Sequence, residues 1–174
     1  MSKTGGASED IRKRTGKASA AYYKLSKVWS NTNIFTRTKV RILKSNVIPV
    51  LIYGCESWRM TRADEHKLDV FLHRWLRRIL KINWTQHVTN DEVRRRAGVK
   101  ELLSETVRRR RWTFIGHTLR RDRRNLARNA LTWTPEGKRK RGRPKETYRR
   151  TVEKKQLGFH SWDAAASVAG DRWK

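Results

Sequence analysis

Four clusters of basic residues carry the chemistry that this sequence offers most clearly. One is spread at helical spacing, and the other three are runs of arginine and lysine. Their members are Lys67, Arg74, Arg78 and Lys81; Arg94, Arg95 and Arg96; Arg108, Arg109, Arg110 and Arg111; and Lys138, Arg139, Lys140, Arg141, Arg143 and Lys145. A single basic run is often only a solvated helix face. Four such clusters repel one another unless phosphates neutralise them, and arginine suits forked contacts to phosphate oxygens, so we predict nucleic-acid binding.

Two further side chains accompany the third cluster. Trp112 follows its four arginines and is a candidate for stacking on a base, with core packing as the alternative. His117 is a candidate for packing or for contacting phosphate, rather than for acting as a base.

The segment Arg141-Gly142-Arg143-Pro144 resembles the core of an AT-hook. In that motif the glycine lets the backbone lie low in a narrow minor groove, and both arginines reach inward. The same residues would also serve as a nuclear localisation signal or as a flexible linker that binds phosphate.

Catalytic signatures are absent from the sequence. There is no GxxxxGK[ST], GxSxG or HExxH motif. The adjacent acids Asp64-Glu65 and Asp91-Glu92 each follow a threonine, which predicts helix capping rather than metal binding. Cys55 is the only cysteine and the five histidines show no paired spacing, so we expect no metal and no cofactor. The chain is not expected to be an enzyme or to take a small-molecule substrate.

Composition favours a polyanionic partner. The 174 residues include 43 Lys+Arg and 16 Asp+Glu, a formal net charge of +27, which favours RNA or DNA and leaves an anionic membrane surface as the second choice. The apolar run at 47–53 is far shorter than the roughly 20 residues that span a bilayer, so a membrane is not expected as a partner. Eight tryptophans indicate that parts of the chain fold. We expect a nuclear protein or a cytoplasmic ribonucleoprotein component, and oligomeric state is left open.

Helical periods run through most of the chain. Ser8 is predicted to cap a first helix, whose apolar face consists of Ile11, Thr15, Ala18, Tyr22, Leu25 and Trp29. A second helix is expected from Thr36, with Val40, Leu43, Val47 and Ile48 inward and Lys39, Arg41 and Lys44 elsewhere. Pro49 is expected to end or kink it. The next residues fit a strand or a helix, and we favour helix because no partner strand is visible.

The later helices have clearer boundaries. Thr61 with Asp64 predicts a capping box, and so does Thr89 with Glu92. The first of these helices carries an apolar stripe of Leu68, Phe71, Leu72, Trp75, Leu76 and Ile79. Gly98 is expected to end the second. Helices are also expected over 100–120, over 126–131 and from Pro144 onward.

An ordered series of motifs resembles one known region. The motifs are IPVLIYGCESW (48–58), FLHRWLRRILKINW (71–84), RRRRWTFIGHTLRR (108–121) and ALTWTPEGKRKRGRPKETYRRTVE (130–153). In this order they resemble the C-terminal region of the LINE-like endonuclease–reverse transcriptases of non-LTR retrotransposons, especially the RTE-related clades. That region follows the polymerase palm and comprises a helical thumb and a basic extension. The resemblance covers roughly residues 4–173.

The helical periods predict an all-α fold and its division into parts, and the resemblance implies a thumb-like identity and a role. The expected fold is all-α: a small thumb-like helical bundle, a basic linker and a short helical extension. The expected parts are a disordered 1–7, a thumb-like and connector region at 8–133, a Gly/Pro linker at 134–144 and an extension at 145–174. The family's endonuclease and palm carboxylates have no counterpart here, and Met1 is expected to be an internal methionine of a once longer frame. The implied function is a non-catalytic, non-specific grip on nucleic-acid backbones; an AT-hook-like architectural DNA-binding protein is the alternative.

Overall fold

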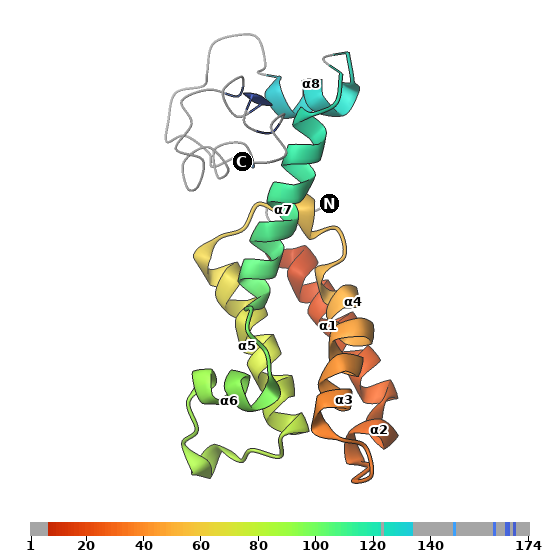
Figure 1. The fold of residues 1–174 in the computed structure, drawn as a ribbon, viewed down its shortest axis with the longest axis vertical. Helices are drawn as coiled ribbons and strands as arrows, with labels where there is room; N and C mark the ends of the chain where they lie inside the picture. The colour runs from red at the N-terminus through yellow and green to blue at the C-terminus, as the bar shows by residue number, and fades with distance from the viewer. Residues whose placement is uncertain are drawn as a thin grey trace. The chain divides into compact units, whose positions relative to one another are not determined.

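The described part of the chain consists of helices joined by turns and loops. A computed structural model describes residues 7–122 and 124–133, together with Tyr148, Trp162, Ala166, Ser167 and Ala169. Within these residues there is no strand, which confirms the predicted small all-α bundle (Figure 1). The helices are α1 (Ser8–Lys24), α2 (Ser26–Ser30), α3 (Thr36–Ile42), α4 (Ile48–Ile52), α5 (Arg62–Ile79), α6 (Asn90–Ala97), α7 (Leu103–Leu119) and α8 (Leu126–Thr132). The chain divides into two compact units, Met1–Arg108 and Arg109–Lys174, and the boundary falls within α7.

The first predicted helix forms in two pieces. Ile11, Ala18 and Tyr22 on α1 are buried as expected, but α1 ends at Lys24 and a turn separates it from α2. Trp29 on α2 folds back, so that its ring stacks on Tyr22 at 4.6 Å and its indole nitrogen donates to the Tyr22 carbonyl at 2.6 Å. The apolar period therefore continues through the turn, because the rings of Tyr22 and Trp29 pack against each other in the core.

The prediction that Ser8 caps α1 is wrong. Ala7 occupies the capping position, and Ser8 is the first helical residue. Its hydroxyl instead donates to Asp64 Oδ1 of α5 at 2.7 Å. Ala7 is buried, so the ordered core begins within the segment expected to be disordered; residues 1–6 lie outside the described part of the chain.

A π-helical turn replaces the kink expected at Pro49. The turn covers Leu43–Val47 and joins α3 to α4, and Pro49 then lies in the first turn of α4, where its missing N–H is not needed. The helical interpretation of this segment is confirmed, and the inward residues Val40, Leu43, Val47 and Ile48 are all buried.

Lys39 lies in the core rather than on the outer side of α3. It is only 5% exposed, and its Nζ donates to the Trp29 carbonyl at 2.9 Å. That carbonyl belongs to the last turn of α2, where unpaired carbonyls and the helix dipole favour a cation. The prediction failed because the hydrogen-bond partner of Lys39 lies at the end of α2. The helical period along α3 does not show that this end lies close to Lys39 in space.

The capping box predicted for α5 is complete. Thr61 Oγ1 accepts from the Asp64 backbone N–H at 3.2 Å, and an Asp64 carboxylate oxygen accepts from the Thr61 backbone N–H at 3.2 Å. The six residues of the predicted apolar stripe are all buried. α5 therefore forms a central wall of the core of the first unit, packed by α1, α3 and α6.

The end of α6 and the start of α7 are each held by a local device. Gly98 ends α6 as predicted, with φ +63° and ψ +35° in the left-handed region. Asp69 of α5 accepts from both the backbone N–H and the hydroxyl of Ser104 at 3.0 and 2.8 Å, which fixes the first turn of α7. The observed α7 lies inside the predicted range of 100–120, and α8 begins at the predicted Leu126.

The second unit has its own small cluster around Ile115 and Leu119 of α7. Partly buried residues packed against it are Trp112, Leu131, Tyr148, Trp162, Ala166 and Ala169. Trp112 thus packs against this cluster, and its stacking on a base stays a prediction. The predicted linker at 134–144 and nearly all of the extension at 145–174 lie outside the described residues, so that division stays a prediction.

Candidate nucleic-acid interface

Helices α1 and α5 lie side by side and run in the same direction (Figure 1). At their starts, the Ser8 hydroxyl donates to Asp64, and at their ends, Arg78 Nη1 donates to the Tyr23 hydroxyl at 3.0 Å. The two contacts join positions that differ by 56 and 55 residues, so the helices keep one register over about four turns. This pair is the scaffold of the candidate site.

A buried carboxylate anchors the pair at one end. Asp64 accepts from the hydroxyls of Ser8 and Thr61, each at 2.7 Å. Burial by itself raises the pKa of Asp64, but hydrogen bonds from Ser8 and Thr61 outweigh it and leave the pKa below its ordinary value. The Asp64 carboxylate is therefore charged at neutral pH, and its role is structural.

A groove of about 740 Å³ opens between the first turns of α1 and the middle of α5. We call it the α1/α5 groove. It is lined by Ser8, Glu9, Ile11, Arg12 and Thr15 of α1 and by His66, Lys67, Val70, Phe71 and Arg74 of α5. The side chains of Ile11 and Phe71 are buried and form an apolar floor, while the charged residues stand at the rim.

The rim of the groove has an excess of positive charge. Its cations are Arg12, Lys67 and Arg74, and its one acid, Glu9, is paired with Lys13 at 2.9 Å. Lys67 Nζ lies 3.6 Å from Asp64 Oδ1. Within the described part of the chain, neither Arg12 nor Arg74 forms an ion pair. These two guanidinium groups are available to an external anion.

The predicted ridge on α5 is largely realised. Arg74 is exposed, and Arg78 continues the same side of the helix, where its guanidinium carbon lies 5.7 Å from the Tyr23 ring centre and 4.9 Å from that of Trp75. Lys81 lies past the end of α5, exposed and with φ +55°. Lys67, Arg74 and Arg78 thus share one side, and Lys81 extends it into the following loop.

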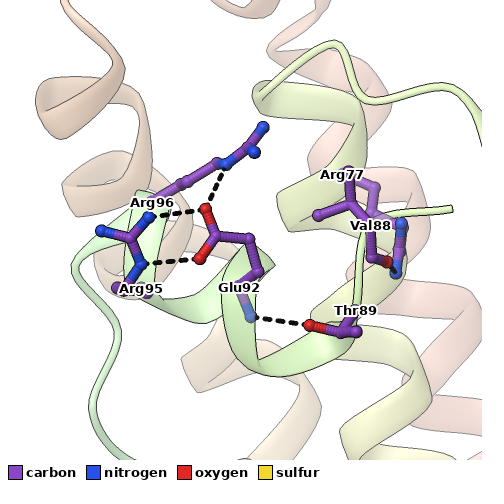
Figure 2. Close-up of polar contacts among 6 residues, drawn as sticks. All are labelled: Arg77, Val88, Thr89, Glu92, Arg95 and Arg96. Atoms are coloured by element: carbon purple, nitrogen blue, oxygen red, sulfur yellow. Dashed lines mark hydrogen bonds and ion pairs between the residues drawn. The ribbon is translucent and has the colours of Figure 1, made fainter. Parts of the chain in front are cut away.

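The basic cluster on α6, Arg94 to Arg96, forms ion pairs with acidic residues of the same helix. The Glu92 carboxylate accepts hydrogen bonds from Arg95 Nε and Nη2 at 2.6 and 2.7 Å and from Arg96 Nε at 2.7 Å (Figure 2). Asp91 forms an ion pair with Arg94. The two arginines lower the pKa of Glu92 to about 2, with the hydrogen bond from Arg95 as the largest cause. Three cations facing two acids leave little charge for a phosphate.

This pairing also corrects the capping box predicted at Thr89 and Glu92. The Thr89 hydroxyl does accept from the Glu92 backbone N–H at 3.3 Å, but the Glu92 carboxylate turns to the arginines instead of returning to the helix start (Figure 2). Only the first half of the box forms. Nearby, Arg77 donates to the Val88 carbonyl at 2.6 Å and to Asn90 Oδ1 at 3.0 Å, so this arginine holds the loop before α6.

The four arginines on α7 do not form one patch, because successive residues of a helix point about 100° apart. Arg108 pairs with Glu65 at 3.4 Å. Arg111 is only 4% exposed, with its guanidinium carbon 5.7 Å from the Tyr148 ring centre. Arg109 and Arg110 are exposed. Arg108 and Arg111 thus have structural roles, which the run of arginines in the sequence did not indicate.

The other predicted site residues contribute differently. His117 is exposed, and its Nδ1 lies 3.0 Å from Arg120 Nη2. The cluster from Lys138 to Lys145, including the Arg141–Pro144 motif, lies outside the described residues. Among the described residues there is no group of three or more side chains suited to holding a metal ion, and no helix there is long and apolar enough to cross a membrane.

Sequence reasoning missed two members of the site, Arg12 and Tyr23. Both lie on α1, separated by eleven residues, which is about 20° of rotation on a helix, so they share one side. The signal was present in principle, since Arg12 directly follows the apolar position Ile11 and borders the buried face. The sequence of α1 does not show that α5 packs beside Arg12 and Tyr23.

The family resemblance rests on the sequence motifs alone. Nothing among known protein-family models, curated proteins or solved structures matches this chain.

Proposed function

We propose that this chain binds nucleic-acid backbones without sequence specificity, as a non-catalytic counterpart of the thumb and basic extension of non-LTR retrotransposon reverse transcriptases. The observation that carries the proposal is the α1/α5 groove, where the exposed Arg12 and Arg74 stand on two helices and, among the described residues, neither forms an ion pair. Phosphate oxygens are the ligands that such guanidinium groups bind best.

The charge balance of the whole chain supports this proposal. If each of the 16 acids paired with one cation, 43 − 16 = 27 cations would remain unpaired. Such an excess destabilises a compact state through self-repulsion and is relieved by a polyanion. Release of condensed counterions from the nucleic acid then supplies much of the binding free energy.

The kind of contact supports sequence-independent binding. The cations of the groove come from helix sides rather than from a helix end aimed at base edges, and backbone contacts of this type position a protein without reading sequence. The motif series quoted above supports a thumb-like role, in which a template–primer duplex is held by its backbone. A nuclear or ribonucleoprotein location follows from this proposal.

The test compares two double variants of equal charge. Arg12→Gln with Arg74→Gln removes both free cations of the groove, while Arg37→Gln with Arg41→Gln removes two exposed cations from α3, which does not line the groove. Fluorescence anisotropy of a labelled DNA duplex should show that the groove variant lowers the slope of log affinity against log salt by about 2, because each lost phosphate contact removes about 1.

The α3 variant should change that slope by much less. Equal losses in the two variants would contradict a localised site. Preference for A·T-rich duplex over G·C duplex and RNA, abolished by Arg143→Ala, would favour the AT-hook alternative instead.

A further inference from the structure

We propose that the α1/α5 groove accepts unpaired nucleotides of a single strand, so that this site discriminates single-stranded from duplex nucleic acid. The inference rests on the proposed function and adds the class of ligand. Three features of the helix pair lead to it: an apolar floor, a cationic rim and an exposed aromatic ring beyond the groove.

A bound duplex would not contact the apolar part of the α1/α5 groove. Ile11 and Phe71 lie at the bottom with only 1% and 3% of their surface exposed, so Val70, which is 41% exposed, supplies most of the apolar side-chain surface that a ligand can reach. A duplex presents phosphates outward and keeps its bases stacked inside, so it would touch the rim and leave this apolar surface wet. An unpaired strand can turn base faces toward apolar side chains while its phosphates stay on the cations.

The dimensions suit a short stretch of strand. A volume of about 740 Å³ is within the range of ordinary ligand sites, roughly 300 to 1,000 Å³. From Ser8 to Tyr23 the α1 axis rises about 22 Å, and a stacked strand advances about 3.4 Å per nucleotide. The helix pair can therefore follow about six nucleotides, of which the groove would hold those at its first end.

The far end of the pair supplies a stacking face. Tyr23 is 55% exposed and lies on the same side of α1 as Arg12. Its ring is fixed by edge contact with Trp75 (5.6 Å, 87°) and by the hydrogen bond from Arg78. A fixed aromatic ring with an arginine beside it is the arrangement that binds single-stranded bases regardless of sequence.

An acidic amphipathic peptide helix is the other occupant that such a groove would fit, because it also combines an apolar face with negative charge. The Tyr23–Arg78 pair in line with the groove favours the nucleic acid, since a peptide would not need a ring at that place. The same site would then bind the backbone and the bases of one strand.

The experiment uses the full chain and a fluorescein-labelled DNA strand of about 16 nucleotides, alone and annealed to its complement. Val70→Asn makes the groove wall polar without changing its charge, and Tyr23→Ala removes the stacking ring. Tyr53→Ala is the matched control: this tyrosine is 71% exposed and has Arg14 at 5.0 Å from its ring centre. Arg14 points about 200° away from Arg12 around α1, so Tyr53 lies off the groove side.

The single strand is expected to bind more tightly than the duplex. Val70→Asn and Tyr23→Ala should each weaken single-strand binding by about 5-fold or more and leave duplex binding unchanged, whereas Tyr53→Ala should change neither. Circular dichroism of each variant checks that the helices are retained.

Equal affinity for strand and duplex in the wild type, with steep salt dependence in both, would overturn this inference and leave the proposed function standing. Absence of binding to either would overturn both. If a designed Leu/Glu amphipathic peptide bound in a Val70-dependent way and the single strand did not, the groove would be a protein-docking site and the inference would be wrong.

Discussion

Removing the Asp64 carboxylate is expected to destabilise the first unit by about 3 kcal/mol. The value is worked from the contacts of Asp64. Losing the capping box with Thr61 costs about 1 kcal/mol, and losing a hydrogen bond from the Ser8 hydroxyl to a charged group costs about 2 kcal/mol. Urea unfolding of the full chain, followed by far-ultraviolet circular dichroism, measures the change for Asp64→Ala.

Two single variants divide this loss between its causes. Ser8→Ala should cost about 2 kcal/mol and Thr61→Ala about 1 kcal/mol, and their sum should approach the loss in Asp64→Ala. Because the pKa of Asp64 is below its ordinary value of 3.8 in the folded state, its contribution is present above that value and is lost as the pH falls through the folded pKa. An unchanged free energy of unfolding in Ser8→Ala would refute the stabilising link between α1 and α5.

Three further predictions concern other parts of the first unit. Glu92→Gln should release Arg95 and Arg96 and raise the affinity for DNA at low salt in anisotropy titrations, and an unchanged affinity would show that these arginines cannot reach phosphates. Gly98→Ala should cost about 1 kcal/mol in urea unfolding from its φ of +63° alone, because no atom lies within 4 Å of the added Cβ; a loss near zero would contradict this origin. Burial lowers the pKa of His73 below 6.5, so wild-type stability should fall as the pH drops from about 7 to about 5 and the unfolded histidine takes up a proton; His73→Gln should lose that dependence, and its persistence would assign it to another group.

Local signals in the sequence predicted the helices well. The box of Thr61 and Asp64 and the apolar stripe of α5 depend only on neighbours within a few residues, and both form. The same signature at Thr89 gave half a box, because Arg95 and Arg96 lie three and four residues beyond Glu92 and hold its carboxylate.

The candidate site was predicted less well, because it depends on which helices become neighbours. Lys39 is buried since the end of α2 lies over it, and Arg111 is buried although it stands in a run of four arginines. The groove pairs Arg12 with Arg74, which are 62 positions apart, and no period along either helix reveals that pairing. Counting the residues in a run of like charge therefore overestimates how many of them are available to a ligand, because some have partners within the fold.

The salt dependence of DNA binding tests the central claim most directly. If unpaired cations on helix sides bind phosphates, with about 6 to 10 contacts, affinity should fall by about 10³ to 10⁵ between about 50 and about 200 mM salt. The measurement is an anisotropy titration of the full chain with a labelled DNA duplex at several salt concentrations. An affinity that hardly changes with salt, or no binding at the lowest salt, would contradict the account.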